Sequence, residues 1–464
     1  MADGNLLQLV ESIVIVMLEN RSFNHMLGHL SYEGFNTVVD GLRAPLEVQQ
    51  YENLFEGESY YPFAMQDGKL PSDVPHERPF VTRQLAHTEV ANRNTMSGFV
   101  DAYYQFTAVN RTDHPEPMGF FRRNQVPITS FLAQNFCVCD RWFAPVPTST
   151  LPNRLMLLAG TTAVDATGGV LPPIAGTFIL DWLRSRRVPW RVYHAGSLSF
   201  LLLLGKADVV LGEGCRGFDK FATDFANETD AEFPKVVLLE PSYGDAPRFG
   251  PLANDNHAPD AVAPGEAFLH AIYTAVIANP ARWAKTVLIV TYDEHGGFFD
   301  HVPPLAVHQP PPPGARFTAP FTTTGPRVPG IVVSPLVVPG SVCHMNFDHT
   351  SVLQLLAERF GAGPTDYSPE VTARRSQGIR SLADALTGPV NPRRPAPPNP
   401  PPVPAQPAAP SDRPTEFTPP VPPGPPTPLQ QAFVDAAKSL AEQMGAQAVP
   451  RFAGILEWRR TLPA

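Results

Sequence analysis

The chain has 464 residues, of which 43% are hydrophobic and 10% aromatic, so it can bury a large core. Its formal net charge is −9 and it contains no block of basic residues, which argues against a polyanion-binding surface and against nucleic acid as a partner. Its four cysteines lack C-x-x-C spacing, which argues against a structural zinc site or a disulfide scaffold.

The amino-terminal sequence bears on where the protein is expected to reside. Its first apolar run follows no basic stretch and precedes no small-residue cleavage pattern, so we expect no signal peptide. No apolar run reaches the length that spans a bilayer, so no transmembrane segment is expected. The sequence alone therefore indicates a cytoplasmic protein.

Short apolar segments recur along the chain and alternate with segments of helical period. In Gly265–Trp283, the side chains of Phe268, Ile272, Val276 and Ile277 share one face of an expected helix. This alternation predicts an α/β fold in which helices flank both faces of a central, mostly parallel sheet. The expected strands are Ile13–Leu18, Arg191–Ala195, Lys235–Glu240, Val287–Tyr292 and Gly330–Ser334.

The distribution of proline indicates how the chain is divided into domains. Many of the 55 prolines fall in Thr387–Pro428, which has too few apolar residues to bury and is expected to be an extended linker. We therefore predict a catalytic domain at 1–386, a linker at 387–428 and a helical segment at 429–464. At the end of the linker, Thr427 is expected to cap a helix that starts at Pro428. One face of this helix is apolar and is formed by Leu429, Phe433, Ala436, Leu440 and Met444.

Two of the expected strands end in pairs of oxygen-bearing residues. Glu19 and Asn20 follow the first strand, and Asp293 and Glu294 follow the fourth. In open α/β sheets, ligands bind outside the carboxyl ends of the strands. Crowded carboxylate and amide oxygens suit a hard divalent cation, although such ligands do not distinguish among several ions. The sequence thus predicts a divalent metal site at this edge of the sheet.

Thr150 is the candidate nucleophile. It lies two residues before Pro152, a residue that favours the first turn of a helix, so its hydroxyl is expected at a helix amino terminus, where an anion is stabilised. A divalent cation would help this hydroxyl to lose its proton and would neutralise charge on a transferring phosphoryl group. The alternative is that Thr150 only caps the helix.

Histidines supply the remaining candidates. His295 follows Asp293-Glu294 and precedes two glycines, which permit a tight turn and close approach of the backbone to a ligand. His87, His194 and His257 are further candidates, the last two because they lie near strand ends. Asp348-His349 reads mainly as a helix start, with Asp348 as its cap and a site role for His349 as the alternative.

Five segments together resemble the phosphoesterase family of bacterial phospholipases C and AcpA-type acid phosphatases. The resemblance spans roughly Ile13 to Gly361 and keeps the order of the motifs in that family. It implies an alkaline-phosphatase-like fold and hydrolysis of phosphate esters, including phospholipids, through a phosphorylated hydroxyl residue. The segments are Leu18–Gly28, Thr150–Arg154, Asn254–Asp260, Thr291–Leu305 and Phe347–Leu353.

The resemblance also assigns roles to single residues. It implies that Glu19, Asn20, Asp293 and Glu294 hold the metal and that Thr150 is the nucleophile. His257 matches a histidine that contacts phosphate or the leaving group. His87 matches a family histidine that precedes an M-x-G-F segment, here Met96–Phe99. The chain departs from the usual S-F-D-H at Asn24 and from H-P-P at Ala258, and neither change removes a proposed ligand.

The mechanism that follows is a two-step displacement. Thr150 attacks phosphorus, and water then hydrolyses the phospho-threonine, while His257 and His295 bind phosphoryl oxygens or protonate the leaving group. Threonine at this position favours a phospholipase C-like activity, and an acid phosphatase acting on monoesters is the alternative. A non-catalytic binding protein that retains the fold is a further alternative, which the presence of all five proposed ligands disfavours.

Overall fold

The structure is a computed structural model, and it describes residues 6–66, 70, 72–88, 93–107, 109–168, 171–196, 199–244, 253–388, 396–403 and 428–444. Its centre is an eight-stranded sheet in the order β10-β9-β11-β1-β12-β15-β8-β16. All five strands expected from the sequence belong to this sheet. Their observed bounds are Ser12–Leu18 (β1), Trp190–His194 (β9), Val236–Glu240 (β11), Thr286–Tyr292 (β12) and Gly330–Val333 (β15).

The sheet is mostly parallel, as the sequence predicted. The neighbouring strands β10, β9, β11, β1 and β12 pair in parallel, and β15 runs antiparallel to its two neighbours, β12 and β8. The strands β1 and β12 at its centre are buried at every residue, which explains why their sequences are apolar without alternation. The remaining three strands are short: Cys137–Cys139 (β8), Cys215–Gly217 (β10) and Val342–Cys343 (β16).

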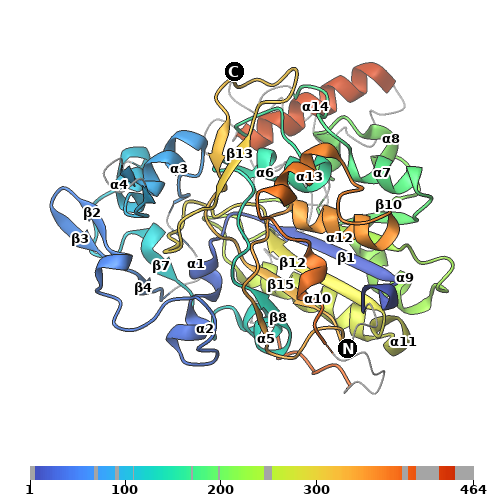
Figure 1. The fold of residues 1–464 in the computed structure, drawn as a ribbon, viewed down its shortest axis with the longest axis horizontal. Coiled ribbons are helices and arrows are strands. Elements are labelled where there is room, and N and C mark those ends of the chain that lie inside the picture. Colours follow the sequence, from blue (N-terminus) through green and yellow to red (C-terminus); the bar gives the residue numbers. More distant parts are fainter. Residues whose placement is uncertain are drawn as a thin grey trace, which may run out of the picture.

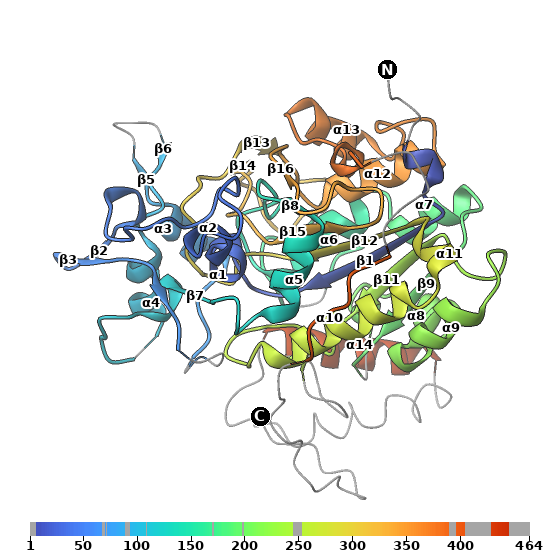
Figure 2. The same cartoon turned by 90° about the horizontal axis from the view of Figure 1, so that it is seen from below.

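Helices cover both faces of the sheet, as expected (Figure 2). One group packs together around α10 and the other around α12. The first group is Pro127–Asn135 (α5), Phe221–Asn227 (α9), Ala263–Ile277 (α10) and Pro280–Trp283 (α11). The second is Thr150–Ala159 (α6), Ile179–Ser185 (α7), Thr350–Phe360 (α12) and Pro369–Ser376 (α13).

The helical segment Gly265–Trp283 is two helices rather than one. α10 ends at Ile277, and α11 begins at Pro280, which has no backbone N–H to continue the first helix. The Asn279 side chain accepts a hydrogen bond from the backbone N–H of Arg282 and so caps the second helix. Phe268, Ile272 and Val276 are buried on the expected face of α10.

A lobe of small elements lies beyond the ends of β1 and β12, on the left in Figures 1 and 2. It contains two helices, Arg78–Leu85 (α3) and Phe99–Phe106 (α4), and has its own apolar cluster, which includes Phe99 and Phe120. This lobe lies against the segment that follows β12, where Gln84 of α3 contacts His295. Its strands are Asn53–Phe55 (β2), Glu58–Tyr60 (β3), Phe63–Ala64 (β4), His87–Thr88 (β5), Arg93–Asn94 (β6) and Gly119–Phe120 (β7).

The remaining elements are short connections. Phe23–Leu27 (α1) and His29–Tyr32 (α2) follow the first strand, and Ala207–Val210 (α8) lies between β9 and β10. Ala306–Gln309 (β13) and Phe321–Thr323 (β14) form an antiparallel pair after β12. None of the helices in the described ranges is both long enough and apolar enough to cross a membrane.

The proline-rich segment is described only at 387–388, 396–403 and Pro428, and residues 396–403 have no regular secondary structure. The helix Pro428–Met444 (α14) begins at the expected proline. Leu429 and Phe433 are buried in the main core, and the Phe433 ring lies 6.4 Å from that of Tyr243. The expected cap Thr427 and the side chains of Leu440 and Met444 lie outside the described residues, and the division into domains stays a prediction.

Glu266 links α10 to α5 by an internal hydrogen-bonded cap. Its buried carboxylate accepts the backbone N–H groups of Ile128 at 2.6 Å and Thr129 at 3.1 Å, both in the first turn of α5. Burial raises the pKa of Glu266 from its ordinary 4.5 to about 7. Glu266 is therefore protonated over a wider pH range in the folded state than in the unfolded state.

We predict that Glu266 makes stability fall as pH rises. Its stabilising contribution is complete below pH 4.5 and is lost as pH rises through about 7, a change of up to roughly 3 kcal/mol. Urea unfolding at pH 5 and pH 8 should show this loss in the wild type and a smaller loss in Glu266→Gln, whose amide does not titrate. Equal losses in the two proteins would contradict the prediction.

Candidate active site

The ends of β1 and β12 bring the two predicted ligand pairs together. Leu18 and Tyr292 are partners in the parallel register, so the residues that follow them leave the sheet side by side. The backbone N–H of Asn20 donates to Asp293 Oδ1 at 3.1 Å. Glu19, Asn20, Asp293 and Glu294 are all fully buried. The predicted juxtaposition of these four residues is therefore present.

Local backbone geometry explains why the turn needs Asn20 and Gly296. Asn20 adopts a left-handed conformation with φ of 56°, which asparagine tolerates better than most residues. A Cβ at Gly296 would lie 2.0 Å from the Asn20 carbonyl oxygen, and one at Gly297 would lie 2.4 Å from that of Pro75. The glycine pair thus permits close approach of neighbouring backbone segments, and the close approach to a ligand that the sequence suggested stays a prediction.

Thr150 is the first residue of α6, and its hydroxyl faces the ligand cluster. Its Oγ1 donates to Asn20 Oδ1 at 3.3 Å. The cap position of α6 belongs to Ser149, so Thr150 is not the helix cap. The structure thus places the predicted nucleophile at a helix amino terminus and in contact with one predicted metal ligand, where the helix dipole favours negative charge.

Arg154 lies one turn further along α6 and bridges the two buried acids. Its guanidinium is 3.1 Å from Glu19 Oε1 and 3.1 Å from Asp293 Oδ2. It also donates to the Tyr243 hydroxyl at 3.1 Å. Although Arg154 belongs to the segment Thr150–Arg154 that resembles the family, the sequence predicted no role for it. The available signal was its spacing of four residues from Thr150, which places both on one face of the helix.

The buried acids have different electrostatic environments. Burial raises the pKa of Asp293, and Arg154 opposes that shift. Burial would also raise the pKa of Glu294, but His76 and His295 outweigh it and lower the pKa below its ordinary value. Glu294 Oε1 accepts no hydrogen bond from any residue that the structure describes. One anionic oxygen is thus available to a cation in this cluster.

Two histidines face Asn20 from opposite segments of the chain. The Asn20 Nδ2 atom lies 2.9 Å from His257 Nε2 and 3.2 Å from His76 Nε2. The Nδ1 atom of each ring contacts a backbone carbonyl, Val74 for His76 and Ala258 for His257. This second contact orients each ring with its Nε2 toward the site, as in histidines that bind metals or phosphate.

His76 was missed because nothing in the sequence Pro75-His76-Glu77 indicates a strand end or a motif. Burial would lower the pKa of His76, but the charges of Glu294, Asp73 and Glu77 outweigh it and raise the pKa to about 9. Only the packing of the lobe on the sheet brings this ring to Asn20.

The site has the chemistry to hold a divalent cation. Asn20 Oδ1, Thr150 Oγ1 and the Asp293 and Glu294 carboxylates supply the hard oxygen donors that the sequence predicted. Glu19 and Asp293 are bridged by Arg154. In addition, Asp73, His76 and His257 each offer a ligand atom, and these three atoms lie within 4.8 Å of one another. These residues fit a divalent cation by donor type, with mixed nitrogen and oxygen ligands beside the oxygen cluster.

Three predicted histidines lie elsewhere. His87 is exposed on the β5–β6 hairpin, where its ring contacts Asn94, so His76 rather than His87 occupies the site. His194 ends β9 and contacts the Gly196 carbonyl, and β11 separates it from β1. His295 is buried behind Glu294, between Glu294 Oε2 at 3.2 Å and Gln84 Oε1 at 2.7 Å. These contacts suit His295 to positioning Glu294.

His349, the alternative candidate, supports the site from behind. Its Nε2 contacts the Asp293 carbonyl oxygen at 2.7 Å, and its Nδ1 accepts a hydrogen bond from Trp142 at 3.1 Å. Burial lowers the pKa of His349 to about 3, so the ring is neutral and donates through Nε2. The cap position of α12 belongs to His349 and not to Asp348, although Asp348 Oδ1 accepts the backbone N–H of Thr350 at 2.7 Å.

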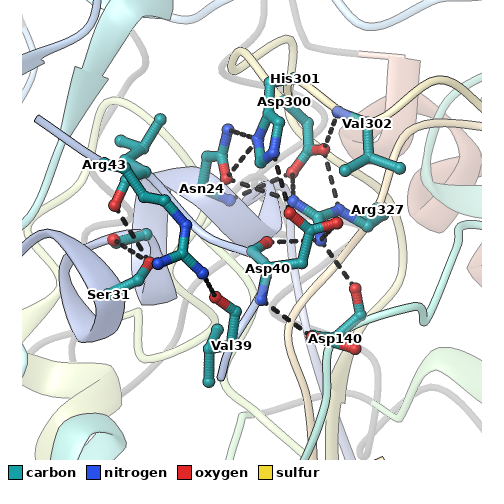
Figure 3. Close-up of polar contacts among 12 residues, drawn as sticks. Asn24, Ser31, Val39, Asp40, Arg43, Asp140, Asp300, His301, Val302 and Arg327 are labelled. Carbon is teal, nitrogen blue, oxygen red and sulfur yellow. Dashed lines mark hydrogen bonds and ion pairs between the residues drawn. The ribbon is translucent and has the colours of Figure 1, made fainter. Parts of the chain in front are cut away.

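A second polar cluster holds the loops after β1 and β12 in place (Figure 3). Arg327 is fully buried at its centre. Its guanidinium binds both carboxylate oxygens of Asp300, at 2.9 and 3.2 Å, and donates to Asn24 Oδ1 at 3.3 Å. It also donates to the carbonyl oxygens of Asp40 and Asp140. Asn24, where the chain departs from S-F-D-H, is thus a structural contact.

Comparison with known proteins identifies the class to which this site belongs. Phospholipase C A of Mycobacterium tuberculosis is 30% identical over 422 residues, which cover 81% of this chain and 77% of that protein. Non-specific phospholipase C6 of Arabidopsis thaliana is 28% identical over 401 residues, 83% of this chain and 73% of that protein. The chain is a phosphoric ester hydrolase. It belongs to the Phosphoesterase family, whose model matches residues 10–363 and so includes the whole site.

Solved structures include more distant likenesses. A protein of the alkaline phosphatase superfamily from Vibrio parahaemolyticus aligns with a TM-score of 0.31 and 13% identity, covering 52% of this chain and 62% of that one. The phosphonate monoester hydrolase of Agrobacterium radiobacter aligns with a TM-score of 0.32 and 12% identity, covering 56% and 72%.

We predict that Arg327→Lys destabilises the protein. A single ammonium group cannot reproduce the paired hydrogen bonds to Asp300 and the contacts with three other acceptors, so unfolding free energy should fall by about 2–4 kcal/mol. Arg43→Lys is the control, because exposed Arg43 donates from its guanidinium to the Thr37 and Val39 carbonyls and to no other residue in the described ranges. Urea unfolding that shows equal effects in the two variants would contradict a central role for Arg327.

Proposed function

We propose that the protein hydrolyses phosphate esters by a divalent-metal-dependent, two-step displacement through a phospho-threonine at Thr150. The observation that carries this proposal is the Thr150 hydroxyl, which lies at the amino terminus of α6 and donates to Asn20 among buried acids. The intact set of predicted ligands and the membership of the Phosphoesterase family support it.

Glu19, Asn20, Asp293, Glu294 and the Thr150 hydroxyl would hold the cation, with Asp73, His76 and His257 beside them. When bound, it would lower the pKa of the Thr150 hydroxyl and neutralise negative charge on the phosphoryl group. Arg154 would keep the Glu19 and Asp293 carboxylates oriented, because it binds one oxygen of each.

The chain's own groups then account for the displacement. The Thr150 oxygen attacks phosphorus in line with the departing alcohol, while the positive end of the α6 dipole favours the negative charge on the phosphoryl oxygens. His257 and His76 contact the amide of Asn20, the residue that the Thr150 hydroxyl also contacts, and are suited to bind a phosphoryl oxygen or to protonate the leaving group. Water hydrolyses the phospho-threonine in the second step.

The substrate proposed is a phosphodiester of the phospholipid type. The relatives are named phospholipase C A and non-specific phospholipase C6, and threonine at the nucleophile position favours the same branch. The alternative within the same chemistry is an acid phosphatase that acts on monoesters.

Thr150→Ala should abolish turnover, lowering kcat by at least about 1,000-fold, because the attacking oxygen is removed. The variant should keep its fold and bind metal. Thr148→Ala is the control, since the buried Thr148 hydroxyl donates to the Asp165 carbonyl instead of the site. Activity should be measured with a chromogenic ester, folding by circular dichroism and bound metal by elemental analysis.

Full activity in Thr150→Ala would refute the nucleophile assignment. Capture of phosphate on Thr150 by acid quench and peptide mapping would test the intermediate directly. A purified protein that neither contains a divalent cation nor is activated by one would favour the non-catalytic alternative.

A panel of two chromogenic substrates separates the phospholipase from the phosphatase. We expect kcat/KM for p-nitrophenylphosphorylcholine to exceed that for p-nitrophenyl phosphate by at least about tenfold, which corresponds to about 1.4 kcal/mol of transition-state stabilisation. Each substrate should be assayed with several divalent cations added back after chelation. Preference for the monoester under all these conditions would favour the acid phosphatase.

A further inference from the structure

We propose that Cys139 and Cys343 are a redox-active pair that forms a reversible disulfide between the two strands at one edge of the sheet. This modification site is separate from the phosphoesterase site and does not depend on its mechanism. It differs from the disulfide scaffold that the sequence argues against, because Cys139 and Cys343 are 204 positions apart in the chain and are neighbours only in the folded sheet.

The sheet register brings the two cysteines together. Cys139 on β8 and Cys343 on β16 are direct partners in a parallel pair. Neighbouring strands lie about 4.8 Å apart, which falls within the Cα separation of about 4.4–6.8 Å found for disulfides. Register partners in a sheet also project their side chains from the same face. In agreement, the neighbouring Cys139 thiol lowers the pKa of Cys343.

The same register makes the pairing specific. Cys137 is two residues before Cys139 on β8, so it lies opposite Ser341, in the segment that precedes β16. Two cysteines at this spacing on one extended strand are about 6.6 Å apart, at the upper end of the Cα separation found for disulfides, so Cys343 is the nearer partner for Cys139. Cys215 is on β10, at the opposite edge of the sheet. Cys343 therefore has Cys139 as its partner.

Exposure determines which thiol reacts first. Cys343 is half-buried, whereas Cys139 is completely buried. The neighbouring Cys139 thiol and the backbone of Met345 lower the pKa of Cys343 despite its partial burial. Cys343 is thus both the accessible thiol and the more acidic one, and Cys139 is placed behind it to resolve the first adduct.

The chemistry is thiol–disulfide exchange with a low-molecular-weight disulfide such as oxidised glutathione. The Cys343 thiolate attacks one sulfur of the reagent, forming a mixed disulfide and releasing one glutathione thiol. Cys139 loses its proton and attacks Cys343 Sγ, which releases the second glutathione thiol. Two protein thiols are oxidised by two electrons in total, and one glutathione disulfide is reduced to two thiols.

The bond would tie together two segments that continue toward the active site. Arg141 and Asn346 hydrogen-bond at 2.7 Å just beyond the pair, and Trp142 and Phe347 form the next backbone bridge. Trp142 then holds His349, which contacts the Asp293 carbonyl. A cross-link that closes so long a stretch of chain should also restrict the unfolded state and raise Tm.

The test is a thiol count on the folded, full-length protein. The protein is incubated with oxidised glutathione, then denatured and titrated with a thiol reagent. We expect two of its four thiols to be lost, a peptide map that shows Cys139 linked to Cys343, and a higher Tm than that of the reduced protein. Dithiothreitol should reverse all three changes.

Variants separate this pairing from general oxidation. Cys215→Ser should still lose two thiols, whereas Cys139→Ser should stop at a glutathione adduct on Cys343 without an internal disulfide. Retention of all four thiols by the folded wild type would overturn the proposal. So would a map that links Cys137 to Cys343, or an internal disulfide in Cys139→Ser.

Discussion

The buried carboxylates at the ends of β1 and β12 are the constraint on which the active site depends. Glu19 and Asp293 are fully removed from water, and each would be costly there without a cation. Arg154 neutralises both and is itself held by the Tyr243 hydroxyl and covered by the Phe200 and Tyr243 rings. The sheet, α6 and the segment that carries Tyr243 are thereby joined through one guanidinium.

This arrangement also explains how Thr150 is placed. Thr150 and Arg154 are one helical turn apart on α6, so the ion pairs that hold the arginine hold the threonine against Asn20. The Arg327 cluster fixes the loops that follow β1 and β12 relative to each other, because Arg327 joins Asn24 to Asp300. The site is therefore held by two buried arginines, each with several acceptors, which favours a rigid geometry.

Sequence reasoning located most of the fold and of the oxygen-bearing site. Short apolar runs identified the five longer strands of the sheet. The runs of β1 and β12 are continuous because parallel strands buried on both faces have no alternating pattern. The polar residues that follow these two runs identified Glu19, Asn20, Asp293 and Glu294. Pro152 indicated the helix that starts at Thr150. The short strands β8, β10 and β16 were not predicted, because two or three residues are too few to show a hydrophobic pattern.

What the sequence determined by itself is local: which segments are apolar enough to be strands, where helices start, and which strand ends bear oxygen ligands. The tertiary structure alone decided which distant side chains share the site. His76, and not His87, faces Asn20 because the lobe packs over the sheet, and His295 lies behind Glu294 because Gln84 holds its ring. Tertiary structure also brings Arg154 to Glu19 and makes Cys343 the neighbour of Cys139. Such contacts join residues far apart in the chain, and no local pattern specifies them.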